Sequence, residues 1–308
     1  MLNLPGAGGN GGPRMTVRSR PGLRHSIIPV LVVAVAAVLA CGDGDQPPAS
    51  EEVRVLASLE IFADMVRNVG GDRVAVKSLL PSGADVHTYE LPPSRVADVA
   101  RADIIFLNGL DLEEQAGRIA RTNANGPVIE LTEALPVVDG NPHLWLDVRL
   151  AAGYVERIRD ELTNIDPDGR TVYEVNAAAY LEELESLDLE MERVIGTIPA
   201  EDRRLVTFHD AYLYLAQRYG LEVIAVVAPS PGQEPSARDL GELSDAIEGV
   251  PAVFKEPQFN AAVLELVADE QGVQVLDLLS DAYVDGVGTY VQLIRFNMEQ
   301  LVEGLGGN

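Results

Sequence analysis

The chain is short of basic residues. It has 23 Lys and Arg against 48 Asp and Glu, and its formal net charge is −25. Four of the arginines precede Cys41 in a stretch with no acidic residue, so residues 42–308 carry 19 basic and 48 acidic residues, a net charge of −29. Such a surface repels phosphate backbones, which argues against nucleic acid as a partner. It attracts cations, but weakly and without selectivity.

The sequence also lacks an apolar segment long enough to span a membrane readily. The apolar run Ile27–Ala40, broken only by Pro29, is shorter than the roughly 20 residues that a span needs. Arg18, Arg20 and Arg24 lie shortly before the run, which is the pattern of a secretory signal. The run ends in VLAC (38–41), which resembles the lipobox of bacterial lipoproteins, where the cysteine is lipidated and becomes the new N-terminus.

We therefore predict a lipoprotein signal peptide over residues 1–41 and a flexible tether over 42–52. A plain cleaved signal with a chance cysteine is the alternative, and Met15 is an alternative start to Met1. Cys41 is the only cysteine in the chain. If it is lipidated, the mature protein has no free thiol, and any metal site must use nitrogen and oxygen donors.

The length of 308 residues suits two domains of about 100–150 residues each, and 47% hydrophobic and 23% charged residues are a globular balance. Strand and helix patterns alternate in both halves, which predicts parallel sheets with crossover helices. The predicted strands are 53–59, 74–80, 104–110, 128–131, 205–208, 223–227, 252–254 and 273–276, and the predicted helices between them are 60–69, 95–101, 211–219, 237–247 and 260–271.

A long helix is predicted between the halves, over 166–198. Asp166 and Pro167 form a favourable start, with Asp as the N-cap and Pro at the first helical position. Apolar residues recur at helical spacing over Tyr173–Ile195 for about six turns, and Gly196 follows as a terminator. This helix is either a rigid spine that joins two lobes or a core helix of one domain.

Histidine is scarce, and its placement is informative. Of the four histidines, His25 leaves with the signal, His87 and His143 lie in loops, and His209 ends a predicted strand. Asp277 ends another strand. Ligands of open α/β sheets bind beyond the carboxyl ends of strands. A single histidine at a strand end is more often structural, but the joint pattern, with two residues from each half, predicts a site in the cleft between lobes.

The chemistry of these four side chains suits a metal ion. Three imidazoles and one carboxylate can saturate a tetrahedral site. Neutral imidazole favours Zn, Ni, Co and Cu(II), and a carboxylate also suits Mn.

The motifs around these residues are PSGADVHTYE (81–90), NPHLWLD (141–147), TFHDAY (207–212) and EPQF (256–259), followed by LD (276–277). Together they resemble the periplasmic or lipoprotein metal-binding proteins that serve zinc and manganese ABC transporters. Val86 stands where proline is common in that family. The resemblance covers essentially the whole mature chain.

The resemblance implies an α/β fold of two (β/α) lobes with parallel sheets, residues 53–165 and 199–308, joined by one long rigid helix, 166–198. It implies metal binding in the interlobe cleft by His87, His143, His209 and Asp277, limited lobe movement, and delivery of the metal to the permease and ATPase subunits of an importer. We expect an extracytoplasmic monomer, anchored to the membrane through lipid on Cys41.

Two departures bear on the metal. Zinc-dedicated members often carry a histidine- and acid-rich loop before the second motif. The corresponding segment here, residues 131–140, is short and contains no histidine. Dedicated manganese members often have Glu at the third position, where this chain has His209. Ligand softness and the stability order favour zinc over manganese.

Neighbouring residues have alternative roles. Glu256 could be a fifth ligand or an outer partner of the site, but a structural hydrogen-bonding role is favoured. Asp147 and Asp210 could orient ligating imidazoles or cap the helices that follow them, and neither role is preferred. Trp145 and Tyr212 are expected to pack around the site.

Two other functions compete with metal capture for import. A zinc hydrolase is disfavoured, because a catalytic zinc keeps an open position and the chain has no H-E-x-x-H helix. An adhesin or interaction role, as described for related lipoproteins, could coexist with metal capture and leaves no trace in the sequence.

Overall fold

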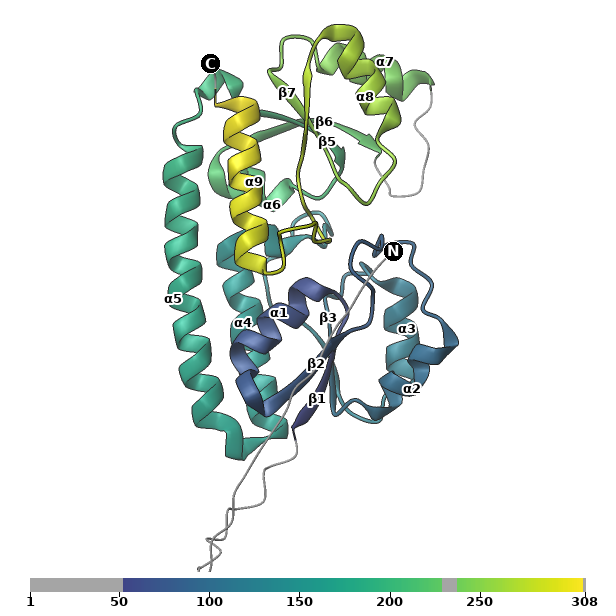
Figure 1. Ribbon diagram of the computed structural model, residues 1–308, viewed down its shortest axis with the longest axis vertical. Coiled ribbons are helices and arrows are strands. Elements are labelled where there is room, and N and C mark those ends of the chain that lie inside the picture. The colour runs from purple at the N-terminus through teal and green to yellow at the C-terminus, as the bar shows by residue number, and fades with distance from the viewer. Residues whose placement is uncertain (1–51, 229–236, 307–308) are drawn as a thin grey trace, which may run out of the picture. The chain divides into compact units, whose positions relative to one another are not determined.

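The computed structural model describes residues 52–228 and 237–306, which belong to one compact unit (Figure 1). The predicted signal peptide with Cys41, and the predicted tether up to residue 51, lie outside these residues. Within them, no helix has the length and apolar character needed to cross a membrane.

The N-terminal lobe is built on a wholly parallel sheet with the strand order β2-β1-β3-β4. Its β-branched and aliphatic residues suit a sheet buried on both faces, and all four residues of β3 are buried. Helices α1 and α4 cover one face, and α2 and α3 cover the other (Figure 1). The bounds are β1 Val53–Ala57, β2 Val74–Ser78, β3 Ile104–Leu107, β4 Val128–Glu130, α1 Glu60–Gly70, α2 Pro93–Arg101, α3 Glu114–Asn123 and α4 Val148–Ile165.

The C-terminal lobe repeats this plan with a parallel sheet in the order β6-β5-β7-β8. Helices α6 and α9 lie on one side, and α7 and α8 on the other (Figure 1). The bounds are β5 Arg204–His209, β6 Glu222–Ala228, β7 Ala252–Lys255, β8 Gln274–Asp277, α6 Leu213–Tyr219, α7 Ala237–Ala246, α8 Ala262–Gln271 and α9 Tyr290–Leu305.

Helix α5, Arg170–Ile195, links the two sheets and confirms the predicted long helix. Its predicted start is wrong in detail. Pro167–Gly169 form a 3-10 turn, and the Asp166 carboxylate caps no helix but pairs with Arg73 at 2.7 Å and accepts the Tyr173 hydroxyl at 2.6 Å. The apolar stripe of α5 is buried as its spacing predicts.

One continuous hydrophobic core includes residues of both sheets together with α1, α4, α5 and α9, and a smaller core lies between the second sheet and helices α7 and α8. Because close-packed interiors resist deformation, we expect this shared core to limit movement between the lobes. Three of the helices that contribute residues to this core, α3, α4 and α9, were not predicted from the sequence patterns. The remaining 3-10 turns are η1 Gly71–Arg73, η2 Leu144–Leu146 and η4 Ala200–Asp202.

Candidate metal centre

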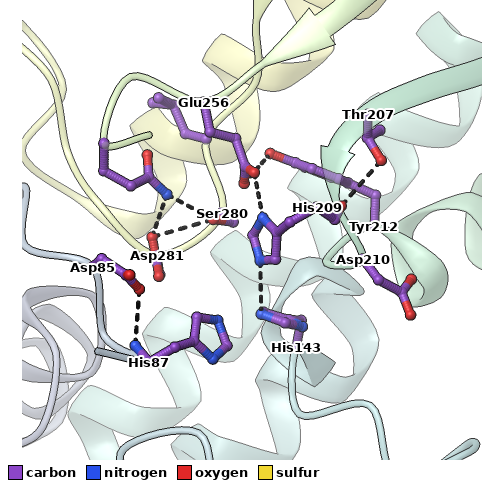
Figure 2. Close-up of polar contacts among 12 residues, drawn as sticks. Asp85, His87, His143, Thr207, His209, Asp210, Tyr212, Glu256, Ser280 and Asp281 are labelled. Carbon is purple, nitrogen blue, oxygen red and sulfur yellow. Dashed lines mark hydrogen bonds and ion pairs between the residues drawn. The ribbon is translucent and has the colours of Figure 1, made fainter. Parts of the chain in front are cut away.

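His87 lies in the loop that follows β2. Its backbone N–H donates to Asp85 Oδ1 at 2.9 Å, and the Thr88 hydroxyl donates to Asp85 Oδ2 at 2.6 Å. Such aspartate-centred turns fix the local backbone. Figure 2 shows the ring directed toward the other two histidines. Among the described residues, the buried His87 Nε2 has no hydrogen-bond partner, so it is available to a ligand.

His143 comes directly before η2, and Asn141 fixes its tautomer. Asn141 Oδ1 accepts from the His143 backbone N–H at 3.0 Å and lies 2.9 Å from His143 Nδ1. The amide nitrogen of Asn141 donates to the Asp210 carbonyl at 2.8 Å. A backbone N–H can only donate, so the atom facing His143 Nδ1 is the acceptor oxygen. Nδ1 therefore carries the proton, and in the neutral ring Nε2 carries a lone pair.

His209 is the last residue of β5, and its Nδ1 pairs with the carboxylate of Glu256, the residue after β7. Glu256 is only 1% exposed, and its other oxygen accepts the Tyr212 hydroxyl at 2.9 Å. A carboxylate only accepts, so His209 Nδ1 donates to it. Glu256 is thus the hydrogen-bonding partner of His209, and both of its oxygens accept hydrogen bonds. Tyr212, expected only to pack around the site, also donates one of these hydrogen bonds.

The distal nitrogens of His143 and His209 face each other, with their Nε2 atoms 3.3 Å apart (Figure 2). Two neutral rings held in these tautomers would point lone pairs at one another, and a proton or a metal ion bound between them would remove this repulsion. Tetrahedral zinc with Zn–N bonds of about 2.0–2.1 Å separates two nitrogens by about 3.3–3.4 Å. The ligand atoms of His87, His143 and His209 all lie within 4.8 Å of one another.

The carboxylate of Asp281 lies close to His87. Its ligand atom lies within 4.8 Å of those of His87 and Asp85. Oδ1 accepts from Gln258 Nε2 at 2.6 Å and from the Ser280 hydroxyl at 3.2 Å. Oδ2 is buried and has no partner among the described residues. Sequence reasoning did not single out Asp281.

Asp277, the predicted fourth ligand, belongs to neither of these groups. It lies opposite Lys255 in the register of β7 and β8, and the Lys255 amine pairs with Glu265 of α8 at 2.6 Å. Paired residues of neighbouring strands project from the same face of a sheet, so Asp277 is directed toward the layer of α8. Three residues, 278–280, separate Asp277 at the end of β8 from Asp281, and the strand-end rule alone cannot choose between these two carboxylates.

Burial and charge separate the acid–base properties of these groups. Burial lowers the pKa of His87 to about 4 and that of His143 well below its ordinary value, with the charge of His209 adding to both effects. Burial also opposes the charged form of His209, but the Glu256 carboxylate outweighs it and raises the pKa of His209. Burial, reinforced by Glu256, raises the pKa of Asp281 to about 7.

A hollow of about 440 Å³ opens beside the three histidines. A larger hollow of about 800 Å³ lies around the start of β1 and residues 100–103, and no histidine lines it. The smaller hollow is therefore the one relevant to metal binding. Besides the histidines, its charged lining residues are Asp111, Asp139 and Asp210.

The two aspartates with open roles have different environments. Asp147 accepts the backbone N–H of Arg149 at 2.8 Å and so caps α4, as one alternative proposed. Asp210 is exposed at the hollow, and α6 begins at Leu213 without a side-chain cap. Trp145 is fully buried, with its ring centroid 5.2 Å from that of His143.

Comparison with known proteins places the chain among metal-binding proteins. The profile of the family described as "Zinc-uptake complex component A periplasmic" matches residues 55–304. The manganese-binding lipoprotein MntA of Halalkalibacterium halodurans is 32% identical over 293 residues, which cover 89% of this chain and 97% of that protein.

Solved structures share the fold. The periplasmic zinc-binding protein TroA from Treponema pallidum superposes with a TM-score of 0.77 at 30% identity, covering 83% of this chain and all of that one. A manganese-bound periplasmic metal-binding protein from Candidatus Liberibacter asiaticus gives a TM-score of 0.74 at 27% identity, covering 82% of this chain and all of that one.

Proposed function

Because the chain belongs to the family of periplasmic zinc-uptake component A proteins, we propose that it captures one divalent transition metal ion through His87, His143, His209 and Asp281 and delivers it to the permease of an importer. The family resemblance of the sequence motifs is thereby confirmed. The protein is a metal-binding substrate-binding component of an ABC transporter and not an enzyme.

The observation that carries the ligand assignment is the pair of facing nitrogens. Asn141 and Glu256 hold the Nδ1 protons of His143 and His209, so both Nε2 atoms are available as donors 3.3 Å apart. His87 Nε2 and Asp281 Oδ2 add two buried atoms without partners among the described residues. Asp277 Oδ1 is also buried without a partner among the described residues, so the closeness of Asp281 to His87, and not the missing partner, distinguishes the two carboxylates. A metal ion would satisfy the three imidazole nitrogens and Asp281 Oδ2.

We infer that zinc is preferred over manganese. Three neutral imidazoles and one carboxylate match the ligand types of zinc, and manganese lies at the weak end of the stability order for nitrogen donors. The relatives do not decide the matter, because MntA is named for manganese and TroA for zinc.

Metal competition with matched variants tests the assignment. Stripped protein should bind one zinc ion and prefer it to manganese. Asp281→Ala should weaken zinc binding, whereas Asp277→Ala removes a carboxylate at the end of β8, just before the same loop, and should leave zinc binding unchanged. Loss of zinc binding in Asp277→Ala with normal zinc binding in Asp281→Ala would overturn the assignment of Asp281 as the fourth ligand. If stripped wild-type protein bound neither metal, the proposed function itself would be wrong.

We also propose that Cys41 carries a lipid that anchors the protein outside the cytoplasm. The support is the VLAC sequence at 38–41 and the word lipoprotein in the name of a relative. Expressed in bacteria, the wild-type protein should partition into detergent, and Cys41→Ser should remain in the aqueous phase. Equal partitioning of the two would contradict the anchor.

A further inference from the structure

Trp145 joins two parts of the metal centre that are far apart in the sequence. It lies in η2, two residues after His143, and is fully buried. Its indole N–H donates to the backbone carbonyl of Ser280 at 2.7 Å. Ser280 immediately precedes Asp281, so the loop from the C-terminal half is fastened to the motif that carries His143.

The same loop is fastened again at its other end. The hydroxyl of Tyr290, the first residue of α9, donates to the backbone carbonyl of Trp145 at 2.7 Å. The Tyr290 backbone N–H donates to Asp64 Oδ2 of α1 at 2.9 Å. Both ends of the segment 280–290 are therefore bonded to Trp145. Ser280 accepts from its indole N–H, and Tyr290 donates to its backbone carbonyl, with Asp281 between these two bonds.

Trp145 itself has little room to move. Its ring packs edge-on against Phe62 of α1, with the centroids 5.3 Å apart, and it lies beside His143. Both hydrogen bonds are buried, and breaking one would leave a buried polar group unsatisfied. The Ser280–Asp281 peptide lies in the loop after β8 of the second sheet and is therefore held by Trp145 of the N-terminal lobe as well.

We propose that Trp145, assisted by Tyr290, is a positioning residue that sets Asp281 Oδ2 against the three histidines. This inference rests on the proposed function. It ties Asp281, which Gln258 also holds from the segment after β7, to the motif that carries His143, so both lobes fix this carboxylate.

A double-mutant cycle tests this role. Trp145→Phe keeps an aromatic ring but removes the indole N–H, and zinc affinity should fall about 10–100-fold, as for other partners of metal ligands. In an Asp281→Ala background the same substitution should change affinity by less than about threefold, because its target is gone. The Co²⁺ absorption spectrum of Trp145→Phe should move toward that of Asp281→Ala, which a purely structural role of Trp145 would not produce.

Tyr290→Phe supplies a milder second variant and should also weaken zinc binding. Tyr173→Phe is its matched control, because the Tyr173 hydroxyl is likewise bonded, to Asp166 at 2.6 Å, but takes no part in the loop. If Trp145→Phe does not fold, Tyr290→Phe enters the same cycle. Wild-type affinity in both loop variants, or an equal loss with and without Asp281, would overturn the inference while leaving the proposed function intact.

Discussion

Lowering the pH should weaken zinc binding through two groups of the site. The sequence alone would assign all three imidazoles ordinary pKa values near 6.5, so protons on all three rings would compete with the metal over the same pH range. The structure separates them. Burial keeps the pKa of His87 at about 4 and holds that of His143 well below its ordinary value, so both rings are neutral and ready to bind at physiological pH.

The competing protons belong to His209 and Asp281. The pKa of His209 is raised, because the Glu256 carboxylate outweighs burial, and burial raises that of Asp281 to about 7. Each group binds metal only after losing its proton, so affinity is full above its pKa and falls as the pH drops below it. One proton is worth tenfold per pH unit, so affinity should fall up to about 100-fold per unit below both pKa values.

The assay is a zinc competition titration against a chromophoric chelator, calibrated at each pH between about 5 and 8 at constant ionic strength. Asp281→Asn should reduce the dependence to about one proton, whereas Asp277→Asn, the matched control, should retain two. A dependence of three protons, or one that Asp281→Asn leaves unchanged, would refute this account of the site.

Three further predictions concern the surroundings of the site and the fold. Glu256→Gln removes the charged partner of His209 and should weaken zinc binding about 10–100-fold in the same titration, and an unchanged affinity would contradict its orienting role. Zinc at about 100 times its Kd should stabilise the stripped protein by about 2.7 kcal/mol, a rise in Tm of roughly 5–11 °C by calorimetry, and no shift would argue against a site in the folded state. Asp188→Ala should lower the free energy of unfolding in urea by about 3–5 kcal/mol, because this buried carboxylate of α5 holds Arg149 and Arg218; a loss below about 1 kcal/mol would show that the network contributes little.

Much of the fold could be predicted from local patterns. The strand runs and the stripe on α5 are periodic because one face of each element is buried, and periodicity survives in the sequence. Helix α4 was not predicted although it is 18 residues long. It begins directly after the Asn141–Asp147 motif, where Asp147 could equally orient a ligand or cap a helix. Asp166 was misread because a carboxylate before Pro has the pattern of an N-cap, whereas its ion pair with Arg73 comes from 93 residues away.

The sequence by itself determined which residue types could form the site. With three histidines left after the predicted signal and a single cysteine in that signal, any metal centre had to use imidazole and carboxylate, and the motifs marked His87, His143 and His209. The tertiary structure decided the rest. It placed Asp281 near His87 and left Asp277 outside both groups of possible ligands, because the path of a loop beyond a strand is set by contacts with distant residues such as Trp145. It also assigned different proton affinities to three chemically identical rings, because burial and the approach of Glu256 are properties of the folded chain.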